Sequence, residues 1–197
     1  MTGQVRLDLL AGDTLTHVLP ALAELRIAVF REWPYLYEGD ADYERRYLTG
    51  FGSAPGAVVV GAFDGARMVG AATACPLEHA DPAFRAPFVE AGYGLADWFY
   101  FAESVLRPDY RGRGIGVAFF ERREAEARRQ GFRRCTFCAV ERGADDPRRP
   151  VGHVPLDEFW RRRGYAPLEL RARFAWRDVG EKGETHKSMA FWSRTLP

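Results

Sequence analysis

The stretch that decides the fold reads VLRPDYRGRGIG, from Val105 to Gly116, and it joins a strand-like segment to a helix-like one. Before it, residues 98–106 are rich in aromatic and apolar side chains and hold no glycine or proline, which favours a β-strand. After it, residues 117–130 also lack glycine and proline and are rich in Ala, Glu and Arg, which favours a helix. The pattern predicts a strand, a glycine-rich turn and a helix in succession.

The turn itself contains three glycines, Gly112, Gly114 and Gly116, spaced two residues apart. Glycine lets a ligand approach the backbone, and the first turn of a helix offers free N–H groups at the positive end of its dipole, so a pyrophosphate fits there. The spacing differs from the Gly-x-Gly-x-x-Gly of dinucleotide sites, and the chain has no Gly-Lys-Ser/Thr of a Walker loop. The alternative is that the glycine turn only connects the strand to the helix and binds no ligand.

Length and composition limit the class of protein. With 197 residues, 47% of them hydrophobic, the chain can bury one substantial core, and we expect a single domain over residues 1–197. It has no apolar run of membrane-spanning length and no secretory signal pattern, so we expect a cytoplasmic protein without a membrane partner. Cys135 and Cys138 fall in a predicted strand, where they point to opposite faces as interior residues, and no metal is expected.

Charge is divided unevenly along the chain. Residues 1–104 hold 7 Arg or Lys against 14 Asp or Glu, whereas residues 105–197 hold 21 against 13. A basic half around the glycine turn suits an anionic cofactor and an acidic half suits a cationic amine, although a solvated surface explains the same counts. Because many of the arginines alternate with glutamates along residues 121–129, nucleic acid is not an expected partner.

The order Arg111-x-x-Gly114-x-Gly116 resembles the coenzyme A loop of the GCN5-related N-acetyltransferases, whose pattern is Gln/Arg-x-x-Gly-x-Gly/Ala. The segment from Phe159 to Tyr165 is similar to the family's aromatic segment, in which a helix ends on a glycine before the next strand. The resemblance covers roughly residues 98–177. It implies an α/β fold of the α+β type, with a mixed sheet of about seven strands flanked by helices and a parallel pair splayed around the acyl-coenzyme A arm.

Hydrophobic periodicity and turn residues predict the other elements. Predicted strands are residues 5–9, 57–63, 68–75, 132–140, 170–177 and 188–193. Predicted helices are residues 20–32, 41–49, 82–90 and 156–163.

Acetyl-coenzyme A is the cosubstrate that the resemblance implies, with transfer of its acetyl group to a primary amine of a small molecule or a peptide. The positions that match the family's cofactor site are Ser104, Val105 and Leu106 for the pantetheine arm, and Arg111, Gly112, Arg113, Gly114, Ile115, Gly116 and Val117 for the pyrophosphate. His153 falls near a cofactor-contacting asparagine of the family. The plain alternatives are a solvated Arg111 and a surface His153.

Glu103 matches a position where many family members carry a glutamate near the acceptor, and it stands in an apolar strand. An amine must be neutral to attack, so a base that accepts its proton is useful. Burial in such a strand raises the pKa of a carboxyl group toward the range of a working base. The alternative is a glutamate fixed by an arginine in the core.

Trp160 stands where the family usually has a tyrosine that protonates the departing thiolate. Indole cannot act as that acid. Either another residue substitutes, with Tyr165, Tyr100 and His153 as the candidates, or a thiolate with a pKa near 8.5 leaves without a dedicated acid.

The acceptor site is expected in segments that vary within such a fold. Trp33, Tyr35, Tyr37 and Trp98 are its predicted aromatic contacts, although aromatic residues are also common in a core. A non-catalytic acyl-coenzyme A sensor and a structural protein with a glycine connector are the competing functions. The oligomeric state stays open between a monomer and a homodimer.

Overall fold

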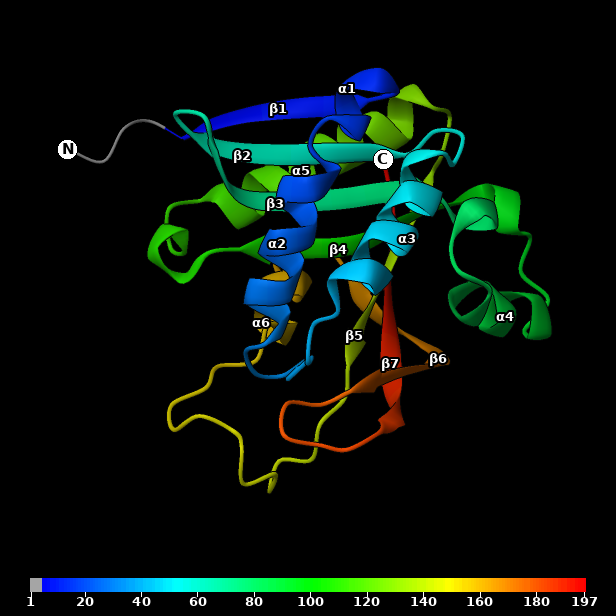
Figure 1. Ribbon diagram of the computed structural model, residues 1–197. Helices are drawn as coiled ribbons and strands as arrows, with labels where there is room; N and C mark the ends of the chain where they lie inside the picture. The colour runs from blue at the N-terminus through cyan, green and yellow to red at the C-terminus, as the bar shows by residue number, and fades with distance from the viewer. Residues whose placement is uncertain (1–4) are drawn as a thin grey trace.

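Seven strands form one sheet in the computed structural model, which describes residues 5–197 (Figure 1). The strands are β1 (Arg6–Ala11), β2 (Val58–Asp64), β3 (Arg67–Pro76), β4 (Trp98–Leu106), β5 (Arg134–Val140), β6 (Ala166–Arg177) and β7 (Glu184–Thr195). Their order across the sheet is β1-β2-β3-β4-β5-β7-β6. Neighbouring strands are antiparallel except β4 and β5, so the sheet is mixed, as predicted.

Helices cover both faces of the sheet. They are α1 (Asp13–Thr16), α2 (Leu19–Phe30), α3 (Ala41–Gly52), α4 (Pro82–Glu90), α5 (Ile115–Arg129) and α6 (Asp157–Arg161). In Figure 1, α2 and α3 lie in front of β2 to β4, and α5 lies behind them. The front core gathers Leu22, Leu25 and Leu48 of these helices against the sheet, and the rear core is rich in phenylalanine. None of these helices has the length and apolar character needed to span a bilayer, within the described part of the chain.

The parallel pair separates along its length. Pairing between β4 and β5 runs only from Trp98↔Arg134 to Tyr100↔Thr136. Beyond Tyr100, none of the described strands pairs with β4 on this side, and Figure 1 shows β5 running away below it. Backbone groups on that edge of β4 are therefore available to a ligand, as the splayed pair of the sequence interpretation requires.

A β-bulge in β4 lies beside this separation. The register with β3 shifts so that two residues of β4, Ala102 and Glu103, stand opposite the single residue Thr73. The Glu103 N–H donates to the Thr73 hydroxyl oxygen at 3.0 Å. A bulge of this kind turns a side chain that alternation would place elsewhere, and here it directs Ala102 and Glu103 to the face covered by α2 and α3.

Arg123 of α5 fills the back of the bulge and is 1% exposed. Its guanidinium donates to the carbonyl oxygens of Thr73 (3.3 Å) and Glu103 (3.1 Å) and to the hydroxyl of Ser104 (2.8 Å), and it lies 4.2 Å from the centre of the Phe101 ring. Burial lowers the pKa of Arg123 to about 10. The helix that follows the glycine turn is thus bonded directly to the bulge.

The predicted elements are all present, with shifted ends. The helix after the turn begins at Ile115, two residues before the predicted start, because Gly114 itself is its N-cap. β6 begins at Ala166, four residues before the predicted start. Pro167 argues against a strand in the sequence, but β6 lies at the edge of the sheet, where a proline is tolerated. The four-residue helix α1 was not predicted, because one turn carries no periodic pattern.

Candidate active site

The glycine turn has an open ligand-facing side. Gly112 and Gly114 adopt φ values of 75° and 80°, which side-chain-bearing residues rarely adopt. Apart from their chain neighbours, none of residues 5–197 has an atom within 4 Å of where a Cβ would stand on either glycine. Gly114 caps α5 without a side-chain hydrogen bond, so its first N–H groups remain for a ligand. A Cβ on Gly116 would stand 3.4 Å from Phe159, which indicates close packing of α5 on α6.

The arginines of the turn have partners within the protein. Arg111 donates to the carbonyl oxygen of Leu106 (3.2 Å) and to the carboxylate of Glu32 (2.8 Å), and both side chains of that ion pair are about half exposed. Arg113 lies over the ring of Tyr110 at 4.9 Å. The exposed ion pair is weak enough for a phosphate to replace Glu32. The role of Arg111 in binding the pyrophosphate stays a prediction.

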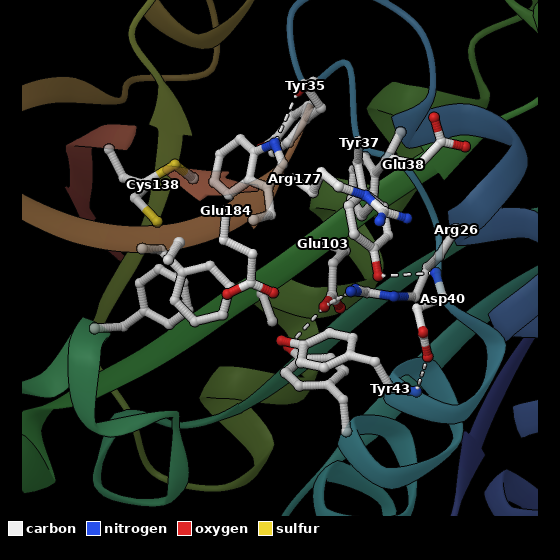
Figure 2. Close-up of a pocket in the computed structure, with 18 of the residues that line it drawn as sticks. Arg26, Tyr35, Tyr37, Glu38, Asp40, Tyr43, Glu103, Cys138, Arg177 and Glu184 are labelled. Carbon is white, nitrogen blue, oxygen red and sulfur yellow. Dashed lines mark hydrogen bonds and ion pairs between the residues drawn. The ribbon is translucent and has the colours of Figure 1, made fainter. Parts of the chain in front are cut away.

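A cavity of about 370 Å³ lies in front of β4, where β5 has turned away (Figure 2). Its wall comes from α2, α3, α4, from β4 to β7 and from the connection between α2 and α3. Nine aromatic side chains line it: Phe30, Tyr35, Tyr37, Tyr43, Tyr47, Phe84, Tyr100, Phe174 and Trp176. Ala102 and Glu103 of the bulge also face it. The predicted base therefore lies in a concave, largely aromatic site.

Glu103 belongs to a buried cluster of charges at this cavity. Arg26 of α2 bonds to Glu103 through Nη1 and to Glu44 of α3 through Nε at 2.5 Å. All three side chains are at most 8% exposed. Although burial by itself lowers the pKa of Arg26, the neighbouring Glu103 and Glu44 outweigh it and raise that pKa. The cluster therefore holds one guanidinium between two carboxylates.

Two hydroxyl groups complete the surroundings of the Glu103 carboxylate. Tyr47 of α3 donates to Oε1 at 2.7 Å, and Thr73 of β3 donates to Oε2. Burial first, and then the charge of Glu103, raise the pKa of Tyr47 well above its usual value. The geometry thus shows the alternative interpretation, in which an arginine holds Glu103 in the core. The same carboxylate also faces the cavity. Its role as a base stays a prediction.

The sequence interpretation missed Arg26, Glu44 and Tyr47. Both charged residues occupy apolar-face positions of their helices, Arg26 four residues after Leu22 and Glu44 four residues before Leu48. A charged residue on the buried face of a helix needs a partner, so that spacing was a signal for a buried ion pair. Which partner each would meet was not readable from the chain.

The connection between α2 and α3, which forms one wall of the cavity, is attached to the β6–β7 hairpin. Tyr37 forms an isolated bridge with Asp178, the Val179 N–H donates to the Leu36 carbonyl at 2.7 Å, and the Glu38 N–H donates to the Arg177 carbonyl at 2.8 Å. We call these contacts the strap. They fix the connection between α2 and α3 against the hairpin at the cavity.

Asp178 is the centre of the charge network behind the strap. It is 4% exposed and accepts from Arg142 (2.7 Å) and Arg148 (2.9 Å), with Lys187 at 2.9 Å. Arg142 also donates to the carbonyl oxygen of Tyr35 at 2.8 Å. Burial raises the pKa of Asp178, but its hydrogen bonds from Arg142 and Lys187 prevail and lower it to about 2.

The predicted acceptor residues are only partly brought together. Tyr35 and Tyr37 line the cavity, as Figure 2 shows. Trp33 instead packs against His153 with ring centres 6.0 Å apart, outside the cavity. Trp98 does not line it either, because the start of β4 packs this residue between Phe88 and Arg134. The acceptor roles of Trp33 and Trp98 are thus not favoured by the geometry.

The candidates for a proton donor also lie apart. The Tyr165 hydroxyl donates to Glu124 at 3.1 Å in the rear core, away from the cavity, and burial raises its pKa. Trp160 packs on the same side, 5.1 Å from Phe137 and from Trp192. Tyr100 lines the cavity, with its hydroxyl 3.3 Å from the sulfur of Cys138. The acid role of Tyr165 stays a prediction that its position in the core does not favour.

The two cysteines of the Cys-x-x-Cys spacing are interior residues on opposite faces of β5, as predicted. Cys135 belongs to the rear core and Cys138 to the front core. Burial raises the pKa of each thiol to about 12, so neither forms a thiolate near neutral pH. Residues 5–197 bring together no group of three or more His, Cys, Asp or Glu side chains that could hold a metal ion.

A model of the acetyltransferase (GNAT) family matches residues 21–165, well over half of the chain. The chain belongs to this family. The match spans the buried charges Arg26, Glu44 and Glu103, the bulge, the glycine turn and the segment ending at Tyr165. Comparison with curated proteins finds no match.

Solved structures share the GNAT fold along nearly the whole chain. A ribosomal-protein-alanine N-acetyltransferase from Brucella melitensis is 15% identical with a TM-score of 0.61, over 98% of this chain and 100% of that one. A GCN5-related N-acetyltransferase from Kribbella flavida is 18% identical with a TM-score of 0.58, over 98% of each. PaiA N-acetyltransferase from Thermoplasma acidophilum, in complex with coenzyme A, is 12% identical with a TM-score of 0.56, over 98% and 100%. At these identities the likeness concerns the fold.

Proposed function

We propose that this GNAT acetyltransferase moves the acetyl group of acetyl-coenzyme A to a primary amine by direct attack. One observation carries the proposal: a buried carboxylate, Glu103, faces an aromatic cavity at the point where β4 and β5 separate, next to an open glycine turn. The coenzyme A of the structurally similar Thermoplasma protein supports the cosubstrate.

The binding roles follow from the chain's own groups. The open N–H groups at Gly112, Gly114 and the start of α5 suit the pyrophosphate, assisted by the helix dipole. Arg111 exchanges Glu32 for a phosphate oxygen. The edge of β4 from Ser104 to Leu106, which β5 leaves unpaired and on which Arg111 bonds to the Leu106 carbonyl oxygen, suits the amides of the pantetheine arm. Backbone supplies most of these contacts, so the fit depends on the glycines more than on other side chains.

The chemistry needs one proton acceptor and one leaving group. A neutral amine nitrogen attacks the thioester carbonyl carbon, a C–N bond forms and the C–S bond breaks, with the electron pair of that bond leaving on sulfur. The proton of the amine passes to Glu103, directly or through the Tyr47 hydroxyl that donates to it. Thr73 and Arg26 keep the carboxylate oriented toward the cavity.

The thiolate leaves without a dedicated acid in this proposal. Trp160 has no acidic group, and the Tyr165 hydroxyl is engaged with Glu124 in the rear core. A thiol with a pKa near 8.5 is a good enough leaving group to depart as the anion. The Trp160 position also favours a second candidate, a sensor that binds acetyl-coenzyme A without turning it over.

The test is release of free thiol from acetyl-coenzyme A in the presence of a panel of primary amines. We expect amine-dependent release, and we expect Glu103→Gln to lower kcat by about a hundredfold with little change in acetyl-coenzyme A affinity. Glu24→Gln, on the exposed face of α2, is the control. Binding of acetyl-coenzyme A with no thiol release for any amine would contradict the transferase proposal and support the sensor.

A further inference from the structure

The strap closes the cavity against a polypeptide. The connection between α2 and α3 is bonded to the β6–β7 hairpin at Leu36, Tyr37 and Glu38. An extended peptide that entered the site between these two segments would need the same backbone groups or the same space. Arg142 and Trp176 also donate to the carbonyl oxygen of Tyr35, so the connection between α2 and α3 is fixed at this residue as well.

Stacked aromatic rings line the interior of the cavity. The ring of Phe84 stacks with Tyr100 (5.5 Å) and with Phe174 (5.1 Å), and Tyr35 stacks with Trp176 (5.9 Å). These rings come from α4, β4, β6 and the strap segment, and they line one space. Offset or edge contacts with such rings favour an aromatic ligand over an alkyl chain of equal size. At about 370 Å³ the cavity lies at the lower end for small-molecule sites.

The charges fit a ligand with a single amine. At the bulge, Glu103 faces the cavity and Glu44 stands behind Arg26, so carboxylates outnumber guanidinium groups in that cluster. The other charged side chains that line the cavity are Arg46, Arg177 and Lys182 against Glu38, Asp40 and Glu184. With three of each sign, this part of the wall exerts no strong net attraction on a polycation or a polyanion.

We infer that the acceptor is a small free primary amine on a flat aromatic body, which enters the cavity whole, and not the end of a polypeptide or a polyamine. The inference rests on the proposed acetyl transfer. The aromatic body lies among Phe84, Phe174 and Trp176, and the amine points to Glu103 at the bulge.

The experiment compares three acceptors that present a primary amine in different settings: 2-phenylethylamine, the tripeptide Phe-Gly-Gly and spermidine. Thiol release from acetyl-coenzyme A is measured for each. We expect kcat/KM for 2-phenylethylamine to exceed that of the other two by about a hundredfold or more, which corresponds to about 2.7 kcal/mol. Values for the tripeptide or spermidine within tenfold of 2-phenylethylamine would overturn the inference and leave acetyl transfer intact.

A variant in the ring wall separates stacking from general hydrophobicity. Phe174→Leu should raise KM for 2-phenylethylamine about tenfold and change that for n-hexylamine less than threefold, because only the aromatic amine loses a ring contact. Phe63→Leu, on β2 and outside the cavity, is the matched control and should change neither value. Thermal unfolding of both variants confirms that each is folded. Equal effects of Phe174→Leu on the two amines would overturn the assignment.

Calorimetry measures the binding of candidate acceptors and therefore tests the inference even without turnover. Protein saturated with coenzyme A, which cannot react, is titrated with 2-phenylethylamine and with Phe-Gly-Gly. Tighter binding of the free amine supports the inference even if no thiol is released in any assay, a result that would count against the transferase activity alone. Equal or tighter binding of the tripeptide would overturn the inference.

Discussion

Replacing Arg123 with methionine tests the contact between α5 and the β-bulge. The variant leaves the carbonyl oxygens of Thr73 and Glu103 without this donor. An unsatisfied buried acceptor costs about 1–3 kcal/mol, so the two cost about 2–6 kcal/mol. Against this, burial lowers the pKa of Arg123 from 12.5 to about 10, which means that keeping the charge there costs about 3 kcal/mol at neutral pH. We therefore expect the change in the free energy of unfolding to lie between a gain of about 1 kcal/mol and a loss of about 3 kcal/mol.

The same change should damage activity more than stability. Arg123 holds the main chain of Glu103, so its loss lets the bulge relax and displaces the carboxylate. Because a displacement of about 1 Å in an active site can cost a hundredfold, we expect kcat/KM for thiol release to fall by about 10- to 100-fold. Arg123→Lys should not rescue either quantity, since one ammonium cannot reach all the oxygens that the guanidinium fork bonds.

Urea unfolding and thiol-release kinetics on the same preparations provide the two measurements. Arg122→Met is the control, because Arg122 is the neighbouring residue on the exposed face of α5. A lysine variant with wild-type stability and activity would refute the reasoning, since charge alone would then suffice. So would a methionine variant that loses more than about 5 kcal/mol, because desolvation would not have offset the lost bonds.

Four further substitutions probe other parts of the site. Gly114→Trp should abolish the heat of acetyl-coenzyme A binding in calorimetry, because its side chain would occupy the open side of the turn at a φ of 80°; binding within threefold of wild type would contradict the phosphate role. Trp160→Tyr should leave kcat within about twofold of wild type, because the side chain at this position packs on the rear core, away from the cavity, and a clear rise in kcat would contradict this placement. A fivefold slower Tyr165→Phe would instead support an acid in the rear core. The pKa of Asp178 is lowered to about 2, so its ionised form stabilises the fold above about pH 4, and this contribution is lost as the pH falls toward 2. Asp178→Asn should therefore lower the melting temperature at pH 7 and make little difference at pH 2. An equal drop at both pH values would show that the stabilisation does not come from the charge of Asp178.

Much of the fold is predictable because its signals are local. Alternation and aromatic content mark β4 and β6, the Asp64-Gly65 turn marks the β2–β3 hairpin, and the glycine spacing marks the phosphate-facing turn. Each of these depends on residues within a few positions of one another. Glu103 was also a candidate, because an acid in an apolar strand is conspicuous.

The sequence by itself therefore determined the order of the strands and of the helices other than α1, the parallel pair and the family resemblance, which the family match and the fold confirm. Tertiary structure alone decided which side chains meet. Arg26 lies 77 residues from Glu103 along the chain and 18 from Glu44, so only the packing of α2 and α3 on β4 unites them. It also sent Trp98 and Tyr165 into the core, since alternation along a strand says that a residue is buried but not against which partner.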